Sequence, residues 1–275
     1  MKYTYSILFG AALFMTACQD KNDELVQPVS QIQFCFTADH STRATDTAFE
    51  LGDKVGISMS DQTDKSQWFY KNMLLINTER DFLSFDPMIY PQQGDVSFLA
   101  YYPFAETLDV ASPTGFEWSV ATDQRDHKSY TNSDLMLAYA GQVANGTNPV
   151  LMDFNHTMSM LEINLIPGAG VTAEEILASN VEITVKQINT AATVIAPEGT
   201  IQDAKQLADI RMFDKVKIEA GKIVGFKAII IPQTFIGGNQ LLEITALHKT
   251  MSFTPQEDVV FQPTKKIVYN INIAK

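Results

Sequence analysis

The stretch Lys266-Ile-Val-Tyr-Asn-Ile-Asn-Ile273 carries an apolar residue at every second position. Side chains of a β-strand point alternately to opposite faces of the sheet, so this period of two predicts a strand with one buried face. The predicted buried face carries Ile267, Tyr269, Ile271 and Ile273. The opposite face carries Val268, Asn270 and Asn272.

Similar apolar runs recur along the chain, separated by clusters of Gly, Pro, Asn and Asp. Short alternating runs between such turn residues are typical of β-sandwiches, so the sequence predicts an all-β fold. The predicted strands comprise residues 31–37, 54–60, 96–101, 161–166, 181–188, 222–231, 241–247 and 266–273.

Few segments favour a helix. The strongest is 172–179, where Thr172 and Glu175 have the spacing of a capping box, and a weaker one is 203–212. The residues Gly237-Gly238-Asn239 lie between two apolar runs and tolerate positive φ, so they predict a hairpin turn.

A cluster of residues that interrupt regular structure, Pro167-Gly168-Ala169-Gly170, follows the run at 161–166. We expect a domain boundary there, with an N-terminal β-sandwich domain at 31–166 and a C-terminal one at 167–275. Both lengths are ordinary for a domain that buries its own core.

The N-terminus combines Lys2, an apolar run and small residues just before Cys18. An apolar core of about a dozen residues suits a secretory signal, whereas a membrane span needs roughly 20. The pattern resembles a bacterial lipobox, which implies a signal peptide at 1–17, cleavage between Ala17 and Cys18, and lipidation of Cys18. A plain signal peptide cut near Ala17 is the alternative.

Residues 18–30 include the acidic stretch Gln19-Asp-Lys-Asn-Asp-Glu24 and have too few apolar residues to fold, so we expect a tether. The stretch resembles the signal that sends Bacteroidota lipoproteins to the outer face of the outer membrane; an ordinary solvated linker is the alternative. The formal net charge of −12 becomes −13 once residues 1–17 leave with Lys2, their only charged residue. This acidity disfavours nucleic acid and anionic membrane surfaces as partners.

The chain has two cysteines, and lipid on Cys18 would leave Cys35 without a partner within the chain. Cys35 lies on the strand face opposite Ile32, Phe34 and Phe36. We expect it to be a packed strand residue rather than a reactive thiol.

No catalytic or cofactor fingerprint occurs: the chain lacks His-Glu-x-x-His, Gly-x-Ser-x-Gly, Gly-x-x-x-x-Gly-Lys and Cys-x-x-Cys. The four histidines are scattered singly, and Asp153 with His156 lacks a third metal ligand. We therefore expect no enzyme activity, no cofactor and no metal. The paired carboxylates of a glycosidase meet only in the fold, so a hydrolase is kept as a third hypothesis.

Aromatic side chains are the other candidates for a ligand site. Rings exposed on loops can stack on sugars, although rings in β-sandwiches usually fill the core between the sheets. Core packing is the favoured interpretation. Trp68 and Trp118 become glycan-binding candidates if they are exposed.

Further stretches keep an order and spacing that cover almost the whole mature chain. They are Thr42-Arg-Ala-Thr45, Phe49-Glu-Leu-Gly-Asp-Lys-Val-Gly-Ile57, Gly94-Asp-Val-Ser-Phe-Leu-Ala-Tyr-Tyr-Pro-Phe104, Ser133-Asp-Leu-Met-Leu-Ala138, Leu151-Met-Asp-Phe-Asn-His-Thr-Met-Ser-Met-Leu-Glu-Ile163, Ile230-Ile-Pro-Gln-Thr234 and 261–273. Together they resemble the fimbrillin family of Bacteroidota, the Mfa-like pilin subunits of type V fimbriae. The resemblance implies two transthyretin-like β-sandwich domains in tandem with little helix, in a fimbrial subunit or accessory lipoprotein that supports adhesion.

The resemblance also implies assembly by strand exchange, in which a subunit is cut after an arginine and loses its first strand. Arg43, followed by Ala44, matches that position in a polar loop that a protease can reach. The displaced strand would carry Ile32, Phe34 and Phe36. The donor strand of the family is C-terminal, which makes Ile267, Tyr269, Ile271 and Ile273 the candidates here.

The role within a fibre stays open between tip, accessory and anchor subunit. The chain stops at Lys275, just after a strand that the second domain needs, and this argues against a stalk role. Retention of the first strand is the alternative to cleavage at Arg43 and fits an anchor. Thr47, in Asp46-Thr47-Ala48, is similar to an O-glycosylation acceptor of this phylum.

The expected location is the outer face of the outer membrane, held by lipid, with release into a fimbrium after processing. The expected partners are other pilin subunits, the outer membrane through the lipid anchor, and host or bacterial surface glycans or proteins. A stand-alone glycan-binding surface lipoprotein is the alternative function.

Overall fold

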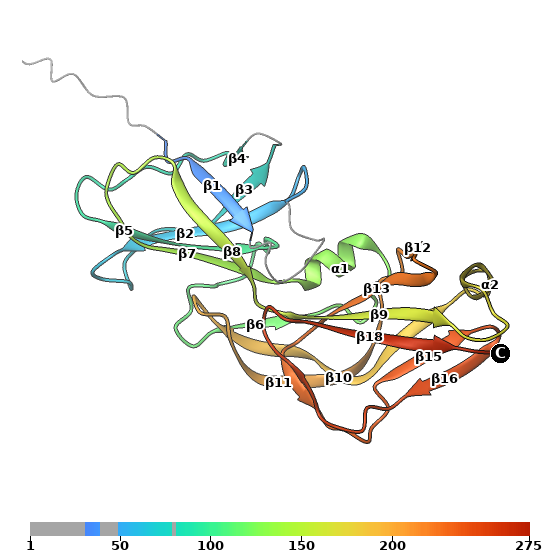
Figure 1. The fold of residues 1–275 in the computed structure, drawn as a ribbon. Helices are drawn as coiled ribbons and strands as arrows, with labels where there is room; N and C mark the ends of the chain where they lie inside the picture. Colours follow the sequence, from blue (N-terminus) through green and yellow to red (C-terminus); the bar gives the residue numbers. More distant parts are fainter. Residues whose placement is uncertain (1–30, 39–48, 79–80) are drawn as a thin grey trace, which may run out of the picture. The chain divides into compact units, whose positions relative to one another are not determined.

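The computed structural model of the chain describes residues 31–38, 49–78 and 81–275. These residues belong to one compact unit that begins at Gln31. Strands dominate it, and the regular helices among the described residues are two short ones, α1 (His127–Ser133) and α2 (Ala173–Ala178) (Figure 1). The prediction of an all-β fold is confirmed.

The largest sheet has seven strands, and all of them come from the first part of the chain. Their order across the sheet is β1 (Phe34–Ala38), β8 (Val150–His156), β7 (Met136–Val143), β5 (Val96–Tyr102), β2 (Lys54–Asp61), β3 (Trp68–Asn77) and β4 (Phe82–Leu83). All its pairings are antiparallel except that of β1 with β8, which is parallel.

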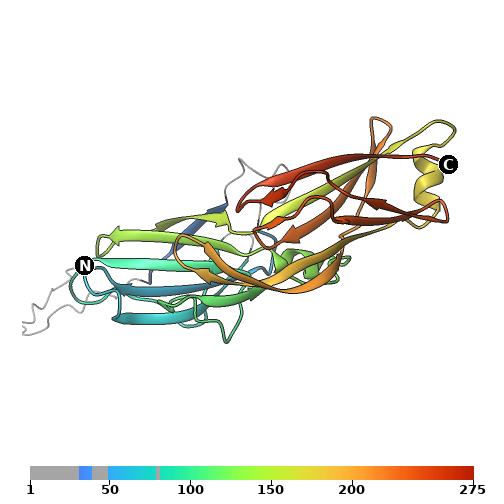
Figure 2. The ribbon, with the colours of Figure 1, turned by 90° about the horizontal axis from the view of Figure 1, so that it is seen from below.

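The remaining strands form three smaller sheets. One contains, in order, β11 (Thr200–Arg211), β10 (Glu182–Ile195), β15 (Leu242–Ala246) and β16 (Lys249–Phe253), with β6 (Phe116–Ser119) also paired to β10. Another contains β12 (Lys217–Glu219), β13 (Lys222–Ile230), β9 (Ser159–Pro167) and β18 (Lys266–Ile273), and the two views in Figures 1 and 2 both show β18 lying beside β9. The last pairs β14 (Gln233–Phe235) with β17 (Val259–Phe261).

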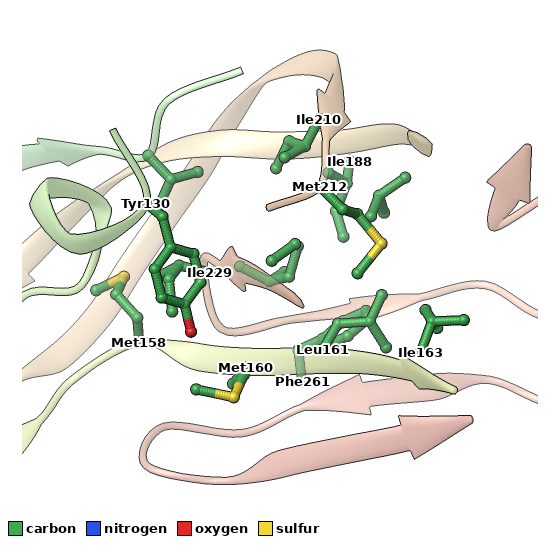
Figure 3. Close-up of a cluster of buried hydrophobic side chains, with 14 of the residues drawn as sticks. Tyr130, Met158, Met160, Leu161, Ile163, Ile188, Ile210, Met212, Ile229 and Phe261 are labelled. Atoms are coloured by element: carbon green, nitrogen blue, oxygen red, sulfur yellow. The ribbon is translucent and has the colours of Figure 1, made fainter. Parts of the chain in front are cut away.

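The buried apolar side chains fall into two clusters. The smaller cluster lies within the seven-stranded sheet, and the larger one is built mainly from the sheets that contain β9, β10, β13 and β15. Figure 3 shows part of the larger cluster, where Leu161 and Ile163 of β9 lie opposite Ile188 and Ile210 of the facing sheet.

Strand β5 takes part in both clusters. Phe98 and Ala100 pack in the smaller cluster, whereas Leu99 and Tyr101 pack in the larger one, because alternate side chains point to opposite faces. A strand buried on both faces explains the continuous apolar run of β5. The domain boundary expected at residue 167 stays a prediction; β9, which ends there, packs in the larger cluster with β13 and β18.

All eight predicted strands are present, with ends shifted by a few residues. The helix predicted at 172–179 is α2, and its capping box is formed: Glu175 N–H donates to Thr172 Oγ1 at 3.2 Å, and Thr172 N–H donates to Glu175 Oε2 at 3.0 Å. Helix α1 was not predicted.

The helix predicted at 203–212 is wrong, because this segment is most of β11. It pairs with β10 over a long antiparallel ladder, and this pairing outweighs the weak helical propensity of its side chains. Asp203 and Gln206 also have positive φ values of 51° and 64°, which an α-helix cannot contain.

The hairpin predicted around Gly237-Gly238-Asn239 is also wrong. The chain does turn there, with φ +79° at Gly238, but β14 before the turn pairs with β17 and β15 after it pairs with β10 and β16. Adjacent apolar runs joined by a turn are therefore in different sheets.

None of the helices among the described residues has the length and apolar character that crossing a membrane requires.

Candidate functional site: the first strand and its groove

Strand β1 is an edge strand that contacts the rest of its sheet through one ladder. It pairs with β8 from Phe34 opposite Val150 to Ala38 opposite Phe154. Ile32 and Phe34 are buried and Phe36 is half-buried, because they point into the smaller cluster. This strand therefore fills a groove whose wall is β8.

Cys35 lies on the outward face of β1 and is exposed. The expectation of a packed thiol is wrong, because none of the described residues covers that face of the edge strand at Cys35. The cysteine is a free thiol.

Aromatic rings hold β1 in the groove. The ring of Phe36 packs edge-to-face against Phe82 and Phe154, with centroid distances of 4.7 and 5.3 Å. Phe34 packs in the same way against Phe98, at 5.4 Å. Such pairs add stabilisation beyond the area that they bury.

Phe49, which follows residues 39–48 in the sequence, also belongs to this aromatic cluster. Its ring packs against Phe82 at 5.1 Å and against Phe154 at 5.2 Å, the same two rings that contact Phe36. The chain on both sides of residues 39–48 is thus anchored on one pair of rings. Loss of β1 would expose these rings but leave Phe49 in place.

The groove has β8 on one side and β4 on the other. Strands β1 and β4 are the two ends of the seven-stranded sheet, and the contact between Phe36 and Phe82 joins them. Removing β1 would therefore open the sheet between β8 and β4.

Polar contacts fix the ends of β1. Ile32 N–H donates to Met88 O at 2.9 Å, and Gln33 N–H donates to the side-chain oxygen of Asn148 at 2.8 Å. Thr37 Oγ1 donates to Asp153 on β8. These contacts add to the main-chain ladder between β1 and β8.

A cavity of about 920 Å³ opens beside the C-terminal end of β1, with Ala38 and Phe49 among its lining residues. The Tyr102 hydroxyl donates to Asp53 Oδ1 there, at 3.1 Å. Burial raises the pKa of both groups, so Tyr102 keeps its proton as the donor. Among the described residues no group of three His, Cys, Asp or Glu side chains is placed to hold a metal ion.

Strand β18 runs parallel to β9 and is an edge strand too. Ile273 is fully buried, and Ile267, Tyr269 and Ile271 pack against the larger cluster. The Tyr269 ring lies 4.9 Å from that of Phe253. The candidate donor strand thus fills its own core.

Several predicted site residues lie outside the described residues: Ala17, Cys18, Arg43, Ala44 and Thr47. Their roles stay predictions.

The favoured interpretation, that the aromatic rings pack in the core, is confirmed for Trp118. This residue is 8% exposed and its indole N–H donates to Ser133 O at 3.2 Å, so it is no glycan-binding candidate. Trp68 is half-buried, and Lys71 Nζ lies 5.7 Å from its ring centroid.

Asp153 and His156 point to opposite sides of β8. Asp153 is exposed and accepts from Thr37, whereas buried His156 has Nδ1 3.0 Å from Asp134 Oδ2. Side chains three apart on a strand cannot share a metal ion in this way.

Sequence reasoning missed Phe49, Phe82 and Phe154 as groove residues. The alternation Leu151-Met-Asp-Phe-Asn-His156 marks Phe154 as inward-facing, but the pairing of β8 with β1 is set by the tertiary fold. Phe82 lies in a strand of two residues, too short for any pattern.

The fold is shared with solved structures of candidate cell adhesion proteins from Bacteroides. One from Bacteroides ovatus superposes with a TM-score of 0.66 at 15% identity, over 90% of this chain and 93% of that one. Another, from Bacteroides uniformis, gives 0.64 at 19% identity, over 89% and 94%. At these identities the likeness shows the fold alone.

Sequence comparison defines the family. The model of the fimbrillin-like family matches residues 42–275, and the chain belongs to that family. A candidate fimbrium subunit of Bacteroides uniformis, Fim1C, is 26% identical over 96% of this chain and 88% of its own length. A candidate fimbrium tip subunit of Bacteroides ovatus is 27% identical over 46% of this chain and 26% of its own length.

Membership of a fimbrial family assigns the protein to the cell surface and to a structural or adhesive role. The resemblance described from the sequence is thereby confirmed at the level of the family.

Proposed function

We propose that this protein is a fimbrial subunit that accepts a strand from a neighbouring subunit into the groove filled by β1. The observation that carries the proposal is the position of β1: an edge strand with one ladder, an aromatic inner face, and a candidate cleavage site in the segment that follows. Cutting after Arg43 would leave β1 held by non-covalent contacts alone.

The strength of these contacts suits an exchange mechanism. Burial of Ile32, Phe34 and Phe36 is worth roughly 1.5 to 3 kcal/mol for each fully buried side chain, or about 5 to 9 kcal/mol in total. That is an upper figure, because Phe36 is half-buried. It is comparable to the net stability of a domain, so an emptied groove would rapidly take up another apolar strand.

The proposed role is that of a tip or accessory subunit, which accepts a strand without giving one. To act as a donor, β18 would have to withdraw Ile273 and three partly buried side chains from the larger cluster. This withdrawal would cost several kcal/mol before any new contact formed. The tip-subunit relative from Bacteroides ovatus is named for such a position.

The proposed life cycle begins with a precursor lipidated at Cys18 and held at the outer membrane. Cleavage after Arg43 removes the lipid and β1 together, since both lie within residues 18–43. Thr47 lies just beyond the cut and stays with the processed subunit as the proposed O-glycosylation acceptor. The two domains proposed at 31–166 and 167–275 would then carry the groove and the retained β18, respectively.

The test uses the full mature protein, treated with an arginine-specific protease. A labelled peptide of residues 31–38 and C-terminal strand peptides of related subunits are then added, and binding is followed by fluorescence anisotropy. We expect the cut protein to bind these peptides and the uncut protein to bind none, because its groove is occupied by a tethered strand.

The matched control is Arg43→Ala, which keeps every other arginine. This variant should resist loss of residues 18–43 and bind no peptide after protease treatment. A cut wild-type protein that stays monomeric and binds no strand peptide would overturn the proposal.

A further inference from the structure

A groove of about 700 Å³ lies on the outer face of the seven-stranded sheet, where β8 is the neighbour of β1. Its floor is formed by outward-facing residues of β7 and β8, and its wall by the turn between β10 and β11 and the loop before β18. The volume falls within the roughly 300 to 1,000 Å³ of small-molecule sites. The residues that carry the argument are Tyr139, Leu151, Asp153, Asn155, Glu198 and Thr264.

Two residues with positive φ, Gly199 and Thr264, allow the loops of the wall to lie close to the strands of the floor. Gly199 has φ +70°, and a Cβ added there would lie 2.9 Å from Thr157 Cγ2, so no larger residue fits. Thr264 has φ +64°, and its N–H donates to Met158 O at 3.1 Å. The groove is therefore a preformed feature of the packed fold.

Tyr139 supplies an aromatic surface at the edge of the groove. Its side chain is 40% exposed and lies along β7 over Gly141, since a Cβ added to Gly141 would be 3.0 Å from the ring atom Cε1. Lys65 is exposed and its Nζ lies 5.6 Å from the ring centroid, so a ligand can displace it at little cost. Leu151, 70% exposed, adds an apolar contact.

Two polar side chains of the groove, Glu198 and Thr264, are available to a ligand, whereas the Asp153 carboxylate already accepts from Thr37. Within residues 31–38, 49–78 and 81–275, no ion pair or hydrogen bond engages the carboxylate of Glu198 or the hydroxyl of Thr264. The Asn155 side chain makes one long contact, 3.3 Å to Asp153 O. Carboxylates accept from hydroxyl groups, and amide and hydroxyl groups both donate and accept.

From these features we infer that the groove binds a neutral sugar of a short oligosaccharide, with its apolar face stacked on Tyr139 and its hydroxyls bonded to Glu198 and Asp153. Two carboxylates repel an anionic ligand, which excludes acidic sugars. β1 does not line the groove, but its Thr37 donates to Asp153 of the floor, so sugar binding is measured on the protein that keeps β1.

The test is an array of neutral, amino and acidic oligosaccharides probed with the full mature protein. Hits are confirmed by titration calorimetry against Tyr139→Ala, Tyr139→Phe and Glu198→Gln. We expect binding to neutral oligosaccharides that weakens about tenfold in Tyr139→Ala and in Glu198→Gln but persists in Tyr139→Phe, because Phe keeps the stacking surface. Phe85→Ala is the matched control, since Phe85 is 87% exposed and lies outside the groove.

Three results would overturn the inference: no neutral oligosaccharide bound at millimolar concentration, binding confined to acidic glycans, or neutral-glycan binding that Tyr139→Ala and Glu198→Gln leave unchanged. Equal loss in Phe85→Ala would also contradict it. The exposed positions of these residues keep the variants folded, which thermal unfolding checks in parallel.

Discussion

Phe36 of β1 and Phe154 of β8 pack edge-to-face with their ring centroids 5.3 Å apart. The two residues are distant in the sequence, and the parallel ladder between β1 and β8 brings them together. This contact joins the first strand to the wall of its groove, so in the proposed strand exchange its strength would govern how easily β1 leaves.

Phe36→Ala should lower the free energy of unfolding of the full chain by about 2 to 4 kcal/mol, because the truncation leaves a cavity between Phe82 and Phe154. Urea unfolding followed by circular dichroism measures the change. Phe85→Ala removes a ring that is 87% exposed, and we expect a change within about 0.5 kcal/mol. Equal effects of the two substitutions would contradict the role of Phe36 in the groove.

Ile273→Ala should cost about 2 to 4 kcal/mol, because Ile273 is fully buried at the end of β18. Val268→Ala, on the outward face of the same strand and 41% exposed, is the matched control with an expected cost below about 1 kcal/mol. Chemical unfolding of both variants distinguishes a strand that belongs to its own core from one held loosely for donation. A loss below 1 kcal/mol for Ile273→Ala would favour donation.

Gln124→Ala should destabilise the protein by about 2 to 4 kcal/mol, since it leaves buried backbone groups without partners. Gln124 is fully buried, its Nε2 donates to Ile229 O at 2.9 Å, and its Oε1 accepts from Ile229 N–H at 2.8 Å. These bonds tie the segment before α1 to β13. Gln256→Ala, an exposed glutamine, should change the stability by less than about 0.5 kcal/mol, and a comparable loss there would sink this interpretation.

The Asp53 carboxyl should make the folded protein less stable as the pH rises, which is the opposite of the usual effect of an Asp or Glu side chain. Burial raises its pKa in the folded state, so its contribution is full below the unfolded pKa and is lost as the pH rises through the folded pKa. The stability of Asp53→Asn relative to the wild type should therefore increase between about pH 3 and about pH 7. Urea unfolding at several pH values measures this difference.

Asp123 is the matched control, because its pKa is lowered in the folded state and its effect on stability changes with pH in the opposite direction. The Arg125 guanidinium, with Nε 2.8 Å and Nη2 2.6 Å from the two carboxylate oxygens, lowers the pKa of Asp123 to about 2. This contribution is present above the unfolded pKa and is lost as the pH falls through about 2. Asp123→Asn should lose stability relative to the wild type as the pH rises, by less than about 1 kcal/mol because the pair is solvated. If the stability of both variants relative to the wild type changed with pH in the same direction, the opposite pKa shifts assigned to Asp53 and Asp123 would be refuted.

The sequence predicted the apolar face of the strand that fills the groove, but it did not predict the strand with which β1 pairs. The alternation of Ile32, Phe34 and Phe36 predicted a strand with an apolar face, and those residues do point inward. The choice of β8 as its neighbour, in parallel, depends on contacts between residues far apart in the chain. Residue patterns carry no information on such pairings, because every apolar strand has the same period.

Which aromatic side chain is exposed also depended on the packed fold. Core packing was the favoured interpretation of the aromatic residues, and Trp118 is buried, because its ring fills the larger cluster. Tyr139, one aromatic residue among many in the sequence, is the ring that lies open beside a groove. Exposure is a property of the packed fold and cannot be read from residue type.

Eight of the strands, the capped helix α2 and the family could be predicted from the sequence alone, because period-two alternation and local capping act between residues that are close in the chain. Three features became visible in the packed fold alone: β11 is a strand, β14 pairs with β17 instead of its neighbour β15, and the rings of Phe36, Phe49, Phe82 and Phe154 meet. These outcomes depend on the competition among long-range strand pairings and on the burial of apolar surface, which are settled only when the whole chain packs.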